Sequence, residues 1–256
     1  MRVTWLNTDP QFASARLRSI IPRDTLYALN MLGPGHDIVI AAKHGWNPLT
    51  VREHATKMVM DVCDDHFDGP LASHYRLACG IADAVTCNSE PMQAIIHEHT
   101  GRTAHVIDDP YEDPELEPTG GDGVLWFGHS SNMPDLEAVA DQIKYPLMVI
   151  NSLNYSTEAL ARALKACRCT IIPTGKKQAK SANRAIRSIR YGKFPVCGPM
   201  PAHEELGLGL DSLGLALDEA MSGDMSVRVR YLQDAIRDRF CPDRVAKEWH
   251  RVLQSL

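Results

Sequence analysis

Short apolar segments alternate with helical patterns along the whole chain, and this alternation constrains the fold more than any other feature. In the first half, the pattern predicts strands at residues 3–6, 37–42, 57–62, 84–87 and 104–107. Helices are predicted between them at residues 13–20, 25–32, 71–81 and 91–98. Strands that alternate with helices are typical of α/β folds with parallel sheets, so we expect an α/β protein.

The segment DDPYEDPELEPTGGDG, residues 108–123, interrupts this alternation. It is acidic, rich in proline and glycine and nearly free of apolar residues, which predicts a linker. A second alternating run follows, with strands predicted at residues 124–127, 147–150, 170–172 and 194–197. Its helices are predicted at residues 134–143, 157–166, 181–191, 212–221, 227–240 and 242–256.

The 256 residues are enough for two domains of ordinary size. We therefore expect two Rossmann-like domains that face a cleft. The first would span residues 1–109, the linker 110–123 and the second 124–256, with the last helix either in that domain or crossing back to the first.

Charge and cysteine content limit the class of protein. The formal net charge of −5 argues against general nucleic-acid binding. The seven cysteines include no CxxC pair, which favours buried free thiols in a reducing cytosol. No apolar segment resembles a signal peptide or approaches the ~20 residues of a membrane span. We expect a cytoplasmic protein without a transmembrane segment.

The strongest candidate site lies in TGKKQAKSANRAIRSIRYGKFP, residues 174–195. A predicted buried strand precedes it, Ser181 stands at an N-cap position, and the helix closes at Gly192. A helix N-terminus at the carboxyl end of a strand binds phosphate, because its free amides and partial positive charge face the ligand. The candidate anion ligands are Lys176, Lys177, Lys180, Ser181, Asn183 and Arg184. The alternative is a solvated basic helix face, to which we assign Arg187 and Arg190.

A second strand-to-helix turn, FGHSSN, follows the strand at residues 124–127. Gly128 would let the backbone approach a ligand, and Ser130 would offer a hydrogen-bond donor. The pattern is weak alone, because any turn of this kind looks similar.

In the first half, Asp64, Asp65 and His66 come directly after a predicted strand. An acid–base or substrate-binding role, a metal site and an exposed acidic loop are all compatible with this pattern, although nothing indicates the closed oxygen shell that calcium or magnesium needs. His66 is favoured as a base because its unperturbed pKa lies near neutrality, and His44 is the reserve candidate.

Three further residues are candidates for binding an acceptor. Trp46 would stack on a sugar or pack the edge of the domain. Arg16 and Arg18 would hold an anion or lie exposed. The chain has no GxSxG, HExxH, Walker A or GxGxxG motif, which argues against α/β-hydrolases, zincins, P-loop enzymes and standard dinucleotide folds.

Five segments together resemble a GT-B glycosyltransferase of the large family related to glycogen and mannosyl synthases. They are ADAVTCNSEPMQAIIHEHTGRTAHVIDDP, VLWFGHSSN, LKACRCTIIPT, SIRYGKFPVCGPMPAHEELG and FCPDRVAKEWHRVLQSL. The first resembles the end of the family's first domain, and the others resemble parts of its donor domain and its closing helix. In the first domain, SARLRSIIPRDTL and DVCDDHFD resemble a subset of such enzymes. The resemblance covers most of the chain.

The resemblance implies a nucleotide sugar, a UDP- or GDP-sugar, bound to the second domain and an unknown acceptor on the first. It also implies hexosyl transfer with no cofactor and no required metal. The family's pair of glutamates, seven residues apart, falls here on Ala179 and Arg187. This departure keeps open a non-catalytic GT-B-like protein that binds a nucleotide or acts as a scaffold. A two-domain sugar-phosphate enzyme such as an epimerase is a third hypothesis.

Overall fold

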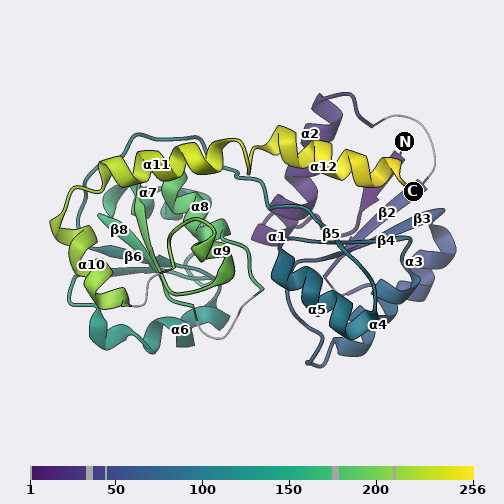
Figure 1. Cartoon of the computed structure of the whole chain (residues 1–256), viewed down its shortest axis with the longest axis horizontal. Helices are drawn as coiled ribbons and strands as arrows, with labels where there is room; N and C mark the ends of the chain where they lie inside the picture. The colour runs from purple at the N-terminus through teal and green to yellow at the C-terminus, as the bar shows by residue number, and fades with distance from the viewer. Residues whose placement is uncertain (1, 33–36, 44, 175–178, 210–211) are drawn as a thin grey trace. The chain divides into compact units, whose positions relative to one another are not determined.

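The computed structural model describes residues 2–32, 37–43, 45–174, 179–209 and 212–256. The chain divides into two compact units. Unit 1 consists of Met1–Glu112, Ala179–Ser181 and Arg239–Leu256, and unit 2 of Asp113–Gln178 and Ala182–Asp238. Each unit has its own sheet of parallel strands with helices packed on it (Figure 1), so the predicted α/β class is confirmed.

The sheet of unit 1 has five strands in the order β1-β2-β3-β4-β5. Its strands are β1 (Arg2–Trp5), β2 (Asp37–Ala42), β3 (Lys57–Val62), β4 (Ala84–Cys87) and β5 (His105–Val106). All four pairings are parallel, and Val39 lies between Thr4 and Met58 in the register. Each new strand joins the same edge, so the strand order never reverses in this sheet.

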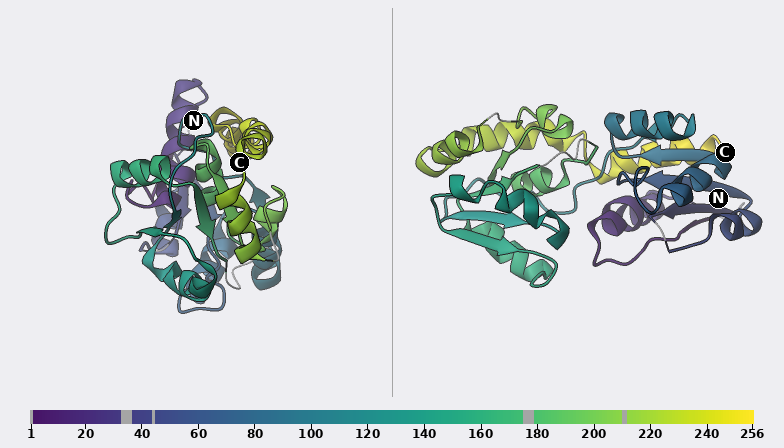
Figure 2. Two further views of the ribbon diagram at one scale, coloured as in Figure 1. Left: turned by 90° about the vertical axis from the view of Figure 1, so that its left-hand side faces the viewer. Right: turned by 90° about the horizontal axis from the view of Figure 1, so that it is seen from below.

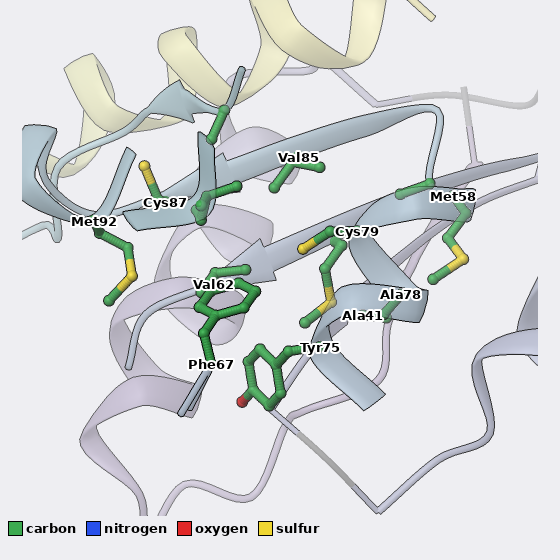
Figure 3. Close-up of a cluster of buried hydrophobic side chains, with 14 of the residues drawn as sticks. Ala41, Met58, Val62, Phe67, Tyr75, Ala78, Cys79, Val85, Cys87 and Met92 are labelled. Carbon is green, nitrogen blue, oxygen red and sulfur yellow. The ribbon is translucent and has the colours of Figure 1, made fainter. Parts of the chain in front are cut away.

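Helices cover both faces of this sheet. They are α1 (Ala13–Ala15), the π-helix η1 (Arg16–Ile20), α2 (Ile21–Ala28), α3 (Pro48–His54), α4 (Ala72–Ile81), α5 (Glu90–Thr100) and α12 (Pro242–Gln254). On one face, Leu26 of α2 and Trp249 of α12 are buried with Ile40. On the other, Tyr75 of α4 and Met92 of α5 pack with β3 and β4 (Figure 3). Burial on both faces explains the continuous apolar runs of the central strands.

Helix α12 belongs to unit 1 although it follows unit 2 in the sequence. Figure 2 shows it beside the strands of unit 1, and it packs against α2. Trp249, Val245 and Val252 form the apolar stripe that the sequence pattern predicted, and all three are buried.

The first helices depart from the prediction of two separate segments at residues 13–20 and 25–32. The structure has one continuous helical run from residue 13 to 28, and it ends four residues earlier than predicted. Pro22 has no N–H to continue an α-helical ladder. A π-turn, in which Ile21 N–H donates to Arg16 O, widens the helix just before it. Helix α3 was missed, although Asn47 caps it and Pro48 opens it.

A buried ionic network joins the elements of unit 1. Arg18 is 1% exposed, and its Nε and Nη2 atoms lie 3.0 and 2.5 Å from the two carboxylate oxygens of Asp61. Asp61 also accepts a 2.7 Å hydrogen bond from Thr86, and Arg18 lies 3.3 Å from Asp109. Burial acts to lower the pKa of Arg18, but Asp61 and Asp109 outweigh it and raise this pKa above its ordinary value.

The sheet of unit 2 has four parallel strands in the order β7-β6-β8-β9. They are β6 (Val124–Phe127), β7 (Leu147–Ile150), β8 (Cys169–Ile172) and β9 (Phe194–Cys197). The helices are η2 (Ser130–Asn132), α6 (Met133–Glu137), η3 (Ala140–Gln142), α7 (Thr157–Ala166), α8 (Asn183–Arg190), α9 (Pro201–Glu204), α10 (Leu213–Ser222) and α11 (Ser226–Arg237). The helix predicted at residues 134–143 is therefore broken into short pieces, and α9 was missed.

The acidic segment predicted as a linker is held by arginines. In unit 2, Arg187 lies 2.9 Å from Asp113 and Arg190 lies 2.7 Å from Glu115. Both arginines are partly or fully buried, so the exposed basic stripe predicted for this helix is wrong. Gly192, with φ of +69°, closes α8 as predicted, and a Cβ there would lie 2.3 Å from Glu117 O.

Six of the seven cysteines are buried free thiols, and Cys241 is partly exposed. Burial raises the pKa of Cys87 and Cys167 to about 11 and that of Cys79 and Cys169 to about 12. Burial raises the pKa values of Cys63 and Cys197 as well.

No helix in the described part of the chain is both long and apolar enough to span a membrane.

We predict that Asp61→Ala destabilises unit 1 by about 3–5 kcal/mol, because it leaves the buried Arg18 without its main partner. Urea denaturation measures this change. The control is Glu248→Ala, which removes an exposed ion pair with Arg244 on α12 and should cost at most about 1 kcal/mol. Equal effects of the two substitutions would contradict the role of the network.

A second prediction concerns thiol reactivity. The thiolate is the reactive form, and high pKa values together with burial suppress it. In the native protein at pH 8, a thiol reagent should modify Cys241 rapidly and the other six only after unfolding. Peptide mapping identifies the modified residue, and rapid labelling of any buried cysteine would contradict the packing described above.

Candidate functional site

The strand order of unit 2 reverses between β6 and β8. After β6 the chain places β7 on one side, and it then returns to place β8 on the other. In open α/β sheets, ligands bind at the carboxyl ends of the strands where the order reverses. The turn after β6 and the helix that follows β8 therefore frame the candidate site.

Arg184 joins these two elements. It lies in the first turn of α8, and its Nη1 atom is 3.4 Å from Phe127 O at the end of β6. A Cβ on Gly128 would lie 3.2 Å from the same nitrogen and 3.3 Å from the Trp126 ring. The glycine therefore makes room for the guanidinium group, which was not the reason that the sequence suggested for it.

Arg184 carries a charge that its neighbours only partly offset. It is partly buried, and within the described residues no carboxylate lies within ion-pair distance of it. Burial lowers the pKa of Arg184, while the negative charge of Asp135 acts to raise it. Because arginine stays protonated in proteins, the site holds a desolvated cation.

The predicted N-cap of α8 is wrong. The N-cap is Ala182, which offers no side-chain acceptor, and Ser181 instead donates a 2.6 Å hydrogen bond to Asp109 Oδ2. Burial raises the pKa of Asp109, although Arg18 and this hydrogen bond act to lower it. Ser181 therefore stands one residue before the N-cap, where its hydroxyl donates to a carboxylate and accepts no amide of α8.

The other candidate anion ligands are divided between the units. Gly128, Ser130 and Asn183 belong to unit 2, whereas Lys180 and Ser181 belong to unit 1. The hydroxyls of Ser130 and Ser152 are hydrogen-bonded to each other in the turns after β6 and β7. Lys176 and Lys177 lie outside the described residues, and the predictions for them and for Lys180 remain predictions.

Ala179, which stands at the first glutamate position of the resembled family, packs into the core of unit 1. Its carbonyl accepts a hydrogen bond of 3.3 Å from Ser89 Oγ. Arg187, at the second position, is paired with Asp113. Both positions therefore have structural partners in this chain.

His203 is a residue at this edge that the sequence reasoning missed. It follows β9 on the short helix α9, is 1% exposed, and its Nδ1 lies 3.0 Å from Gly198 O. Burial lowers the pKa of His203 while the Gly198 bond raises it, and the charge of Arg184 lowers it further. A histidine six residues after a predicted strand end was the available signal.

In unit 1, the three candidate catalytic residues after β3 have different partners. Asp64 pairs with Lys43, a residue at φ of +63° where β2 ends. Asp65 is exposed and accepts a 3.1 Å hydrogen bond from Phe67 N–H. His66 lies against Tyr75, with ring centroids 5.1 Å apart. His44 lies outside the described residues.

The three residues predicted to bind an acceptor make contacts within unit 1. Arg18 is buried in the ionic network, so the prediction that it holds an acceptor is wrong in this arrangement. Arg16 pairs with Glu112 at 2.6 Å. Trp46 donates to Ala42 O and meets the His74 ring edge to face, which favours the alternative that it packs the edge of the domain.

Among the described residues, no group of three or more histidine, cysteine or acidic side chains is placed to hold a metal ion. A cavity of about 70 Å³ in unit 2 is lined by Arg168, Phe194 and Met225, among others. Arg168 and Phe194 stand where β8 and β9 begin, at the edge opposite Arg184.

A scan of protein-family models and a search of curated proteins find no match for this chain. A search of solved structures finds many. The apo structure of OtsA matches with a TM-score of 0.62 and 12% identity, over 91% of this chain and 76% of that one. Anabaena Alr3699/HepE in complex with UDP and glucose matches with a TM-score of 0.59 and 12% identity, over 100% of both chains.

A third match is the Glycosylation Associate Protein (Gap123) complex from Streptococcus agalactiae, with a TM-score of 0.53 and 12% identity, over 94% of this chain and 58% of that one. OtsA and HepE are GT-B glycosyltransferases. At such low identity the likeness concerns the fold alone. The chain therefore has the GT-B fold with two Rossmann-like domains, as the sequence resemblance predicted.

Proposed function

We propose that the chain is a glycosyltransferase that takes a sugar from a nucleotide-sugar donor, a UDP- or GDP-sugar, and passes it to an acceptor of unknown identity. The donor would bind at the carboxyl edge of the unit 2 sheet. The single observation that carries this proposal is Arg184, a desolvated cation without a carboxylate partner among the described residues, placed where the strand order reverses.

The chemistry of the reaction explains why such a cation is useful. Cleavage of the sugar–phosphate bond leaves negative charge on the departing diphosphate. A fixed guanidinium group beside Gly128 would stabilise this charge more in the transition state than in the bound donor, which lowers the barrier. Planar guanidinium also matches phosphate oxygens with two parallel hydrogen bonds.

The edge that holds β2 and β3 of unit 1 would bind the acceptor. Asp64, Asp65 and His66 stand there, and one of them would orient the acceptor hydroxyl or remove its proton. The carboxylate of Asp64 pairs with Lys43, and the carboxylate of Asp65 accepts a hydrogen bond from Phe67 N–H. His66 remains the first candidate for the base, because a histidine side chain ordinarily titrates near neutrality.

The alternative is a non-catalytic GT-B-like protein that binds a nucleotide or supports another transferase. The observation in its favour is that Ala179 and Arg187 stand where the family has glutamates, and that both have structural contacts. The similarity to the Gap123 complex also fits this alternative. Donor binding without turnover would favour it over the enzyme.

We predict that Arg184→Ala weakens the binding of UDP or GDP by roughly 1.5–3 kcal/mol, about 10- to 150-fold, because one charge-assisted contact is lost. Isothermal titration calorimetry measures the affinity. Arg230→Ala, which removes an equally charged but 61% exposed side chain of unit 2, should leave it unchanged. Unchanged affinity in a folded Arg184→Ala protein would remove this residue from the site.

A further prediction concerns turnover. If His66 acts as the base, His66→Ala should reduce donor hydrolysis or transfer by about 100-fold or more, while donor affinity is unchanged. Asp65→Asn tests the second candidate, and His54→Ala, which removes an exposed histidine of α3, is the control. Wild-type rates in both candidate variants would exclude His66 and Asp65 as catalytic residues.

A further inference from the structure

The surroundings of His203 determine which ring nitrogen carries the proton when the ring is neutral. Its Nδ1 faces the Gly198 carbonyl oxygen at 3.0 Å. A carbonyl oxygen only accepts hydrogen bonds, so Nδ1 carries the proton and Nε2 of the neutral ring is a bare acceptor. Within the described residues, no hydrogen bond reaches Nε2.

The loop that carries this histidine is tightly held against the end of β8. Gly198 N–H donates to Ile172 O, and Thr174 Oγ1 donates to Pro199 O, each at 3.0 Å. A Cβ on Gly198 would lie only 2.7 Å from Thr174 Oγ1, so only glycine permits this approach. The imidazole is therefore held at the same sheet edge as Arg184 rather than being free to turn into solvent.

The charged groups around His203 come from several elements. Arg184 on α8 follows β8 and His203 on α9 follows the neighbouring parallel strand β9, so both groups belong to the same carboxyl edge, and the charge of Arg184 lowers the pKa of His203. Asp135 on α6 acts on Arg184, and Glu204 and Glu205 adjoin His203 in the chain. The described residues thus place an imidazole with a lowered pKa at the same sheet edge as a cation.

We propose that His203 is a proton-linked, charge-balancing residue of the donor site. When a diphosphate occupies the site beside Arg184, Nε2 of His203 takes up one proton from solvent and the ring becomes an imidazolium. This inference rests on the proposed function. The bound diphosphate replaces the repulsion from Arg184 with a net attraction, and it therefore favours the charged ring.

The sign of the pH dependence follows. The pKa of His203 is below its ordinary value in the free protein, and a nearby anion raises it. Proton uptake on binding means that affinity increases as the pH falls through the window between the two pKa values. One linked proton gives at most about a tenfold change in affinity for each pH unit.

The test is calorimetry with UDP-glucose and GDP-mannose between pH 6 and 8, in two buffers with different ionisation enthalpies. The diphosphate of a nucleotide sugar is esterified at both ends and has no group that titrates in this range. Any proton taken up must therefore bind to the protein. We expect net proton uptake and affinity that is several-fold higher at pH 6 than at pH 8.

Two variants assign the proton. His203→Asn keeps an N–H donor for Gly198 but has no group to protonate, so both the uptake and the pH dependence should disappear. His97→Gln is the control, because His97 is an exposed histidine of α5 in unit 1, outside the candidate site, and should not contribute. In case His203→Asn does not fold, NMR titration of the His203 Cε1–H signal in the wild type, with and without donor, should show a higher pKa with donor.

Donor binding without proton uptake, or equal uptake in a folded His203→Asn protein, would overturn this inference and leave the proposed function intact. An unchanged NMR pKa on donor binding would overturn it as well. If neither nucleotide sugar binds at any pH, the proposed function fails and the inference fails with it.

Discussion

The reversal of strand order between β6 and β8 selects the candidate site of this protein. Parallel pairing brings the carboxyl ends of β6, β8 and β9 to one edge. Because of the reversal, the chain runs from β6 to β7 in one direction along the sheet and from β8 to β9 in the other. Arg184, Gly128 and His203 all lie at this edge although they are separated in the sequence. The five strands of unit 1 show no such reversal, so the same argument does not select a site there.

Charge balance distinguishes the two sets of buried cations. In unit 1, Arg18 is matched by Asp61 and Asp109, and this network contributes to structure rather than to binding. In unit 2, Arg187 and Arg190 are likewise matched by Asp113 and Glu115. Arg184 on the same helix has no such match among the described residues, and a desolvated cation of this kind is best stabilised by an anionic ligand.

The sequence predicted the strands well because their apolar runs are short, bounded and buried. Residues 37–42, 57–62, 84–87, 124–127, 147–150 and 194–197 are strands with the predicted bounds. Helix α3 was missed, since its seven residues carry little apolar periodicity and only Asn47 and Pro48 mark its start. Helix ends depend on local chemistry that periodicity does not record.

The candidate site was harder to predict because partners distant in the sequence decide the role of each polar side chain. Ser181 matches an N-cap pattern, but the helix begins one residue later and the hydroxyl of Ser181 donates to Asp109. Arg18 resembles an anion ligand until Asp61, far along the chain, is placed beside it. Arg184 was identified from its helix position, whereas His203 needed the packing of the loop after β9.

A structure of the protein with UDP bound tests the central claim most directly. The account predicts that the diphosphate lies at the carboxyl edge of the unit 2 sheet, with a phosphate oxygen within hydrogen-bond distance of Arg184 and close to the backbone of Gly128. A diphosphate bound elsewhere on the protein, with Arg184 left without an anion, would contradict it.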